Sequence, residues 1–235
     1  DALAFYNPVR NDVQGIGLPI QDHSALFGSQ GRLQGYVDMA AMSRYSFNSL
    51  EPAFRKPLNT LAHELMHRWG IAGRYRTSTG TLSTDLIGRD GSHWSLLADT
   101  SASIMYGARW TPLAAGEYQV SEARQRLSRW DLYLAGLVSA AEVPPLQLLR
   151  GTGLDPTAFP EIGQRAQATI ETVHIQQLIA AEGERVPSSA NAQRAFTAAL
   201  VLVARPDQPL DPQKLAQLKR FATRFESYFQ SITEG

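Results

Sequence analysis

The sequence predicts a mixed α+β fold, and three stretches of the chain carry that prediction. Residues 57–70 have the apolar spacing of an amphipathic helix. Residues 31–42 alternate between apolar and polar side chains, as a half-buried strand does. Residues 196–204 form a near-continuous apolar run, which is typical of a strand covered on both faces. We therefore expect a mixed sheet that packs against a buried helix.

The composition is that of an ordinary folded domain, and it argues against several classes of partner. Of the 235 residues, 43% are apolar and 19% are charged, which suits one large domain or two small ones. The 22 basic residues balance 22 acidic ones and form no basic stripe, so we expect no nucleic-acid partner. The longest apolar run covers residues 195–204 and is too short to span a bilayer, so we expect no membrane span.

The chain contains no cysteine, so any metal or catalytic chemistry must use other side chains. The absence of disulfides suits an exported bacterial protein as well as a cytosolic one. The chain begins with Asp1 rather than with methionine. We therefore expect an N-terminus that was cut by processing or by the choice of expressed segment.

The N-terminal part is expected to contain two short strands separated by irregular chain. Residues 3–6 predict a short apolar strand, whereas glycines and prolines make residues 13–20 irregular. His23 lies in a polar loop, where a solvated side chain is expected rather than a metal ligand. The strand predicted at 31–42 is either an edge strand or an interior strand, and its pattern does not distinguish the two.

The helix predicted over residues 57–70 has a core face and a polar face. Pro57 and Asn59 are typical of a helix start. Gly70 and Gly73 are expected to end the helix, because glycine tolerates a left-handed conformation. The core face is an apolar stripe formed by Leu58, Leu61, Ala62, Leu65 and Trp69.

The polar face carries a His-Glu-x-x-His motif, formed by His63, Glu64 and His67. Four helical residues advance about 6 Å and slightly more than one turn, so both imidazoles project from one face and can hold one metal ion. Glu64 lies about 100° around the helix from His63, where a general base for a metal-bound water belongs. The alternative is a buried helix whose histidines are satisfied by hydrogen bonds.

A catalytic zinc site needs a third protein ligand and one open position. His93 is the leading candidate, because it is the only histidine between Gly70 and Met105. Glu117 is an alternative, since it begins a predicted helix that covers residues 116–137. Three nearby acidic residues also stay open as ligands: Asp85, Asp90 and Asp99.

A stretch rich in glycine and proline at residues 151–160 is the candidate domain boundary. We therefore divide the chain into a first domain, residues 1–150, and an α+β C-terminal subdomain, residues 151–235, that packs on it. Within the second part, the patterns predict a strand at 168–173, a short helix at 175–181, the buried strand at 196–204 and a long amphipathic helix that Asp211 caps.

Through Gly70 the motif extends to His-Glu-x-x-His-x-x-Gly, and in this form it resembles the metzincin zinc endopeptidases. Compact metzincins carry their third histidine three residues after that glycine, where this chain has Gly73. Leishmanolysin-like relatives insert residues before the third histidine, and His93 suits that arrangement. The run Ser103-Ile104-Met105-Tyr106 resembles the astacin form of the Met-turn beneath the zinc, although that form has one more residue before its tyrosine.

The resemblance covers residues 33–105, and it implies a zincin-like catalytic domain with a mixed sheet and an active-site helix. It implies that Zn²⁺ is the cofactor and that its ligands are His63, His67 and His93. Residues 90–94 and 130–134 resemble stretches of uncharacterised exported bacterial zincins, so a secreted or extracytoplasmic location is also implied.

The same resemblance implies a metalloendopeptidase that acts on peptide or protein substrates. In it, Glu64 would be the general base, Met105 would form the Met-turn and Tyr106 would be a candidate transition-state stabiliser. Two alternatives from other classes stay open. One is a catalytically inactive zincin-fold binding module, and the other is a zinc amidase that acts on non-protein amides.

Overall fold

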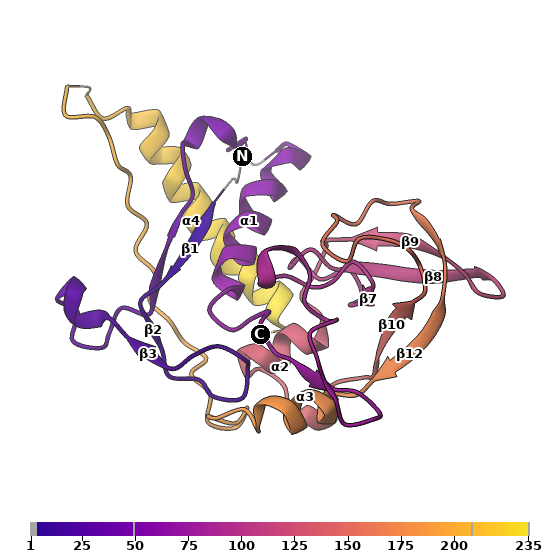
Figure 1. Cartoon of the computed structure of the whole chain (residues 1–235). Coiled ribbons are helices and arrows are strands. Elements are labelled where there is room, and N and C mark those ends of the chain that lie inside the picture. Colours follow the sequence, from indigo (N-terminus) through magenta and orange to yellow (C-terminus); the bar gives the residue numbers. More distant parts are fainter. Residues whose placement is uncertain (1–3, 49, 208, 235) are drawn as a thin grey trace.

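A computed structural model describes residues 4–48, 50–207 and 209–234. Over these residues the fold is mixed α+β, with one six-stranded mixed sheet, three two-stranded sheets and four α-helices. The predicted fold class is therefore confirmed at this level. Figure 1 shows the large sheet on one side of the molecule, with α1 and α4 side by side next to it.

The six-stranded sheet has the order β11-β9-β8-β7-β10-β12. Its strands are β7 (Ala98–Asp99), β8 (Ala108–Ala114), β9 (Glu117–Ala123), β10 (Leu146–Arg150), β11 (Arg165–Gln167) and β12 (Thr169–Val173). All neighbours are antiparallel except β7 and β8, which are parallel. Strands from both sides of residue 150 thus share one sheet, and a domain boundary at that point stays a prediction.

Three small sheets lie outside the large one. They pair β1 (Phe5–Pro8) with β4 (Gly35–Asp38), β2 (Arg10–Asn11) with β3 (Gln21–Asp22), and β5 (Tyr75–Arg76) with β6 (Leu82–Ser83). β4 lies within the strand predicted at 31–42, and its Val37 is half-buried between the exposed Tyr36 and Asp38. Within the described chain β4 pairs only with β1, so it is an edge strand.

The α-helices are α1 (Arg55–Met66), α2 (Arg129–Ala135), α3 (Ile175–Glu182) and α4 (Pro212–Thr233). Short 3-10 helices cover Ser24–Phe27, Met42–Arg44, Pro52–Phe54, Arg89–Gly91 and Ala140–Glu142. α4 begins as predicted, because the Asp211 side chain accepts a hydrogen bond from the Gln213 amide. It packs on α1 through Phe221, which joins Leu58 and Leu61 in one apolar cluster. None of the helices described here has the length and apolar character needed to cross a bilayer.

The end of α1 differs from the prediction, because the helix stops at Met66 rather than at Gly70. Gly70 does not adopt a left-handed conformation; instead, a Cβ atom there would lie 2.9 Å from the Leu134 Cδ1 atom. Gly73 is likewise packed closely, since a Cβ atom on it would lie 3.1 Å from the Leu178 Cδ1 atom. Both glycines therefore allow close packing after the helix rather than a left-handed turn.

Two predicted elements in the second half of the chain are wrong. Residues 196–204 form an exposed, irregular connection before α4, with Val201 79% and Val203 87% exposed. No strand hydrogen-bonds to this run in the described structure, so its apolar side chains have no sheet to cover them. The helix predicted at 116–137 is instead strand β9 followed by α2, because Gly116 turns the chain into a hairpin and Val120 is buried in the sheet.

Candidate metal centre

The motif residues lie at the C-terminal end of α1. His63 and Glu64 are in its last turn and are buried, whereas His67 follows directly as the half-buried C-cap residue with helical backbone angles. The apolar stripe faces the core as predicted, with Leu58, Leu61, Ala62 and Trp69 buried and Leu65 half-buried. The amphipathic pattern thus aims the motif side chains away from the hydrophobic core.

The chain that follows α1 brings His93 next to His63 and His67 at the end of that helix. The Ile71 amide donates to the Ser92 carbonyl at 3.2 Å, and the Trp94 amide donates to the Met105 carbonyl at 3.0 Å. These two bonds hold the segment around His93 between the end of α1 and the Met105 turn. Ligand atoms of the three histidines lie within 4.8 Å of one another, so they could hold one metal ion. The structure therefore brings together the three histidines that the sequence singled out.

The hydrogen bonds of two of these histidines indicate which nitrogens are available as ligands. The Nδ1 atom of His63 lies 2.7 Å from the Ile104 carbonyl oxygen, and that of His93 lies 2.9 Å from the Arg89 carbonyl oxygen. Carbonyl oxygens only accept, so each Nδ1 carries the proton and each Nε2 presents a lone pair. The two Nε2 atoms face one another at 3.1 Å. Two lone pairs at this distance repel unless a cation lies beside both, so the donor set fits a metal ion.

Burial keeps the three imidazoles in the neutral form that binds metal. It lowers the pKa of His63 to about 3 and that of His67 to about 4, and it lowers the pKa of His93 as well. Mutual repulsion between the neighbouring imidazoles adds to the effect at His63 and His67. The site is therefore ready to bind a cation at neutral pH without first losing protons.

Glu64 sits next to the triad in an environment suited to proton transfer. Burial raises the pKa of its carboxyl group to about 7, and a backbone hydrogen bond from Tyr6 on β1 offsets part of that rise. Burial, with the Glu64 charge nearby, also raises the pKa of Tyr45 to about 12. Tyr6 and Tyr45 therefore border Glu64. Sequence reasoning missed both residues, because each comes from a segment without a motif.

Met105 and Tyr106 lie against the histidines. Met105 is fully buried in the main core cluster, and its amide donates to the Ser103 hydroxyl at 3.1 Å. Tyr106 has a left-handed φ of 61°, and its ring stacks on His93 with a centroid distance of 4.2 Å and an interplanar angle of 11°. We call the rings of His63, His93 and Tyr106 the stacked side of the site. Whether Met105 forms a true Met-turn and Tyr106 acts in catalysis stays a prediction.

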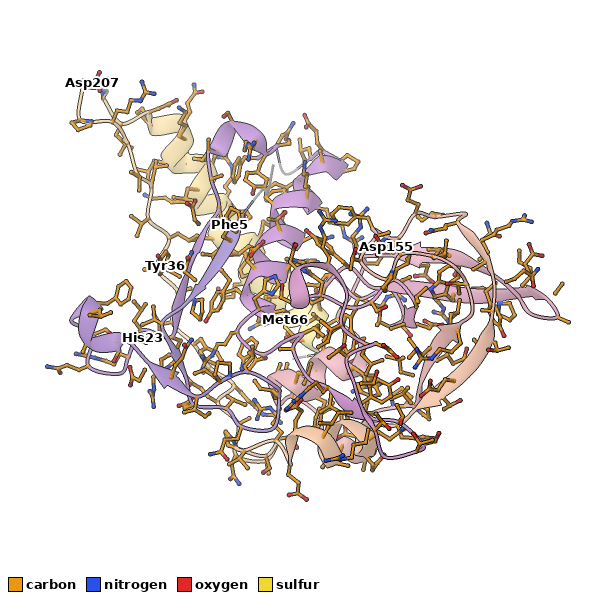
Figure 2. The ribbon with its side chains drawn as sticks, viewed as in Figure 1. Phe5, His23, Tyr36, Met66, Asp155 and Asp207 are labelled. Carbon is orange, nitrogen blue, oxygen red and sulfur yellow. The ribbon has the colours of Figure 1, made fainter. Side chains whose placement is uncertain are left out.

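The rival ligands and the other histidines lie outside this cluster. Glu117 begins β9 and pairs with Arg165, whereas Asp85 pairs with Arg150 and Asp90 with Arg89. His23 is exposed at the edge of the molecule (Figure 2), and His174 is exposed at the N-terminus of α3. Over the described residues, the three histidines are the only group of three or more potential metal ligands close enough to share an ion.

His67, unlike His63 and His93, borders a cavity. A cavity of about 300 Å³ adjoins His67, and we call His67, Arg68 and this cavity the cavity side. The cavity is lined by residues from β1, from the loop that follows it and from the end of α1: Tyr6, Pro8, Arg10, Asn11, Leu18, Pro19, Gln21, His67 and Arg68. A ligand can therefore approach His67 from this direction.

Comparisons with protein-family models, with curated proteins and with solved structures find no match to this chain. The metzincin resemblance therefore rests on the motif residues and on the three histidines that the fold brings together.

Proposed function

We propose that this protein is a zinc-dependent metalloendopeptidase. The observation that carries the proposal is the convergence of the three histidines, two with their Nδ1 protons fixed by carbonyls, beside a buried Glu64. Three neutral imidazoles suit zinc, and they leave a fourth position for water or substrate. Access to the half-buried His67 from the adjoining cavity supports such a fourth ligand.

When bound, zinc would supply Lewis-acid chemistry, since it acidifies water and polarises a carbonyl oxygen. Glu64 would take the proton of the attacking water and deliver it to the leaving amine. In the metal-free protein burial raises its pKa to about 7, so the carboxyl group can hold or release a proton near neutral pH. The Tyr6 amide, which bonds to the carboxylate, would hold it in place during both transfers.

Peptides are the proposed substrates because an extended chain could add to the small sheet next to α1. β4 is an edge strand, and both β4 and its partner β1 contact α1. An edge strand offers free backbone groups that can bind an extended peptide by strand addition. Export from a bacterial cell is part of the same proposal and follows from the resemblance alone.

The proposal is tested by metal analysis and by Glu64→Gln. We expect one zinc per chain after dialysis, and digestion of casein that stops when a chelator is added. Glu64→Gln should keep the zinc and lower hydrolysis by about 10²–10⁴-fold or more, because the amide keeps the shape but cannot act as a base. Glu161→Gln, in an exposed loop, is the matched control and should behave as wild type.

Two outcomes would overturn the proposal. A chain that takes up no zinc would show that the three histidines are structural. A zinc-loaded chain that binds peptides but cleaves none would instead be a binding module with the same fold.

A further inference from the structure

The cavity beside His67 contains a buried guanidinium group whose hydrogen bonds are incomplete. Arg68 is 8% exposed, and its Nη1 atom donates to the Arg10 carbonyl at 2.8 Å. Its Nη2 atom lies 3.5 Å from an Asp12 carboxylate oxygen, which is a long contact. Its Nε atom is buried and has no hydrogen-bond partner among the described residues. The long Nη2 contact leaves donor capacity on the guanidinium group, so this position favours a ligand that brings an acceptor.

Near Arg68 the positive charges exceed the negative ones. Asp12 is half-exposed and is shared with Arg10, to which it lies closer, at 3.1 Å. Asp22, also half-exposed, pairs with Arg10 at 3.6 Å. Arg185 is buried nearby and is repelled by Arg68. Three guanidinium groups therefore share two solvent-accessible carboxylates, and the buried end of the cavity keeps a positive potential.

The remaining lining suits the carbon chain of an acidic side chain. Pro8, Leu18 and Pro19 offer apolar contact, while Gln21 is half-buried and polar. The Tyr6 hydroxyl donates to the Gln34 carbonyl at 3.3 Å and also lies within hydrogen-bonding reach of the Arg68 side chain. The walls are thus apolar and neutral up to the guanidinium groups.

We propose that this cavity is a specificity subsite that receives a glutamate or aspartate side chain of a peptide substrate, with Arg68 donating charge-assisted hydrogen bonds to its carboxylate. This inference rests on the proposed peptidase function. His67 belongs both to the cavity wall and to the three-histidine cluster. The residue seated in the cavity therefore lies close to the scissile bond and selects where the chain is cut.

The test uses zinc-loaded enzyme and a set of blocked peptides in which each position in turn is Glu, Gln, Asp, Asn, Leu or Lys. At one position next to the cleaved bond, we expect Glu to exceed Gln by about tenfold or more in kcat/KM, as charge-assisted bonds to a buried group require. Arg68→Gln should bring this ratio close to one while cleavage of the Gln peptide continues. Arg165→Gln removes an equal charge from an exposed position on β11 and should leave the ratio unchanged.

A second variant keeps the test informative if Arg68→Gln does not fold. Gln21→Glu places a carboxylate in the cavity while Arg68 stays in position, and it should also remove the preference for Glu. A wild-type enzyme that cleaves Glu and Gln peptides equally well at every position would overturn the subsite and leave the peptidase intact.

A binding measurement separates failure of the subsite from failure of the peptidase proposal. Glu64→Gln loaded with zinc should bind the Glu peptide about tenfold more tightly than the Gln peptide in a calorimetric titration. If wild type cleaves nothing but this preference persists, the subsite stands in a binding module. If neither cleavage nor preference is found, both proposals are wrong.

Discussion

The stacked side and the cavity side hold the same kind of side chain in different ways. On the stacked side, His63 and His93 are buried, and a backbone carbonyl fixes the second ring nitrogen of each. On the cavity side, His67 is half-buried at the end of α1 and borders a cavity. The stacked side could therefore hold a metal ion, and the cavity side leaves His67 accessible to a ligand.

This difference assigns separate roles to the segments that meet at the site. The turn that contains Arg89 and the segment that contains Ile104 supply carbonyls, so they determine the tautomers of the ligands. The N-terminal strands and the end of α1 shape the cavity, where the proposed substrate side chain would bind. Substitutions on the stacked side or at His67 should change metal affinity, whereas those of Arg68 and the other cavity-lining residues should change selectivity.

The largest expected effect is on the stacked side. His93→Ala leaves two protein donors, so we expect zinc affinity to fall about a hundredfold or more. A competition titration with a chromophoric chelator measures the change. Glu117→Ala is the control, because Glu117 pairs with Arg165 away from the histidines and its loss should leave zinc affinity unchanged. The opposite result would replace His93 by Glu117 as the third ligand.

Asp131 hydrogen-bonds to Trp94, the residue after His93. Its substitution is expected to have the next largest effect. It is fully buried on α2, and it accepts hydrogen bonds from the Trp94 indole at 2.8 Å and from the Ser128 amide and hydroxyl at 2.6 and 2.7 Å. Asp131→Ala leaves these donors unpaired in the core. We expect a loss of about 3 kcal/mol or more in the free energy of unfolding, measured by urea denaturation.

Ser128 and Asp131 form a capping box at the start of α2, and a second capping box, formed by Ser139 and Glu142, provides the control for Asp131. Glu142 accepts from the amide and hydroxyl of Ser139 in the same pattern, but this pair is exposed. Glu142→Ala should therefore cost only about 1 kcal/mol. Because Trp94 follows His93, Asp131→Ala should also weaken zinc binding, whereas Glu142→Ala should not. Equal losses in the two variants would show that Asp131 only caps α2.

The raised pKa of Glu64 predicts a smaller, pH-dependent effect on the free energy of unfolding of the metal-free protein. Burial raises its pKa from 4.5 to about 7, so the folded protein holds this proton more tightly than the unfolded chain does. Its ionisation therefore costs stability as the pH rises from about 4.5 through about 7. Glu64→Gln removes this cost, and we expect a gain of about 2 kcal/mol at pH 8 with little gain at pH 4. Urea denaturation in chelator at both pH values measures it, and a gain that is independent of pH would contradict the assignment.

The sequence predicts the site better than the fold around it, and the reason is the range of the interactions. His63, Glu64 and His67 are related by helix geometry, which is local, and the apolar stripe of α1 confirms its register. His93 required a motif resemblance, because its place depends on the return of the chain after Gly70. Tyr6 and Arg68 could not be predicted, because their contacts join segments that are distant in sequence.

The strand wrongly predicted at residues 196–204 has the same cause, because burial of a strand depends on contacts with segments that are distant in the sequence. An apolar run indicates a buried strand only if a sheet has a vacant edge to receive it. Here the run pairs with neither edge strand of the large sheet, β11 or β12, in the described structure. It crosses the surface instead, where Phe196 contacts Trp69 from a distant part of the sequence. The apolar pattern of one segment carries no information about whether a strand elsewhere in the chain will pair with it.

The smallest expected effect tests whether the stacked side acts by packing or by chemistry. The Tyr106 ring lies parallel to His93 and 4.7 Å from the centroid of His63, so its aromatic face covers both rings. Tyr106→Phe keeps this face, and we expect zinc affinity to change by less than about threefold. Tyr106→Ala removes it and should weaken zinc binding about tenfold, since such ring pairs contribute about 0.5–1.5 kcal/mol. If Tyr106→Phe instead keeps the metal but lowers kcat by about tenfold or more with KM unchanged, the hydroxyl stabilises the transition state, and the stacked side takes part in catalysis as well as in metal binding.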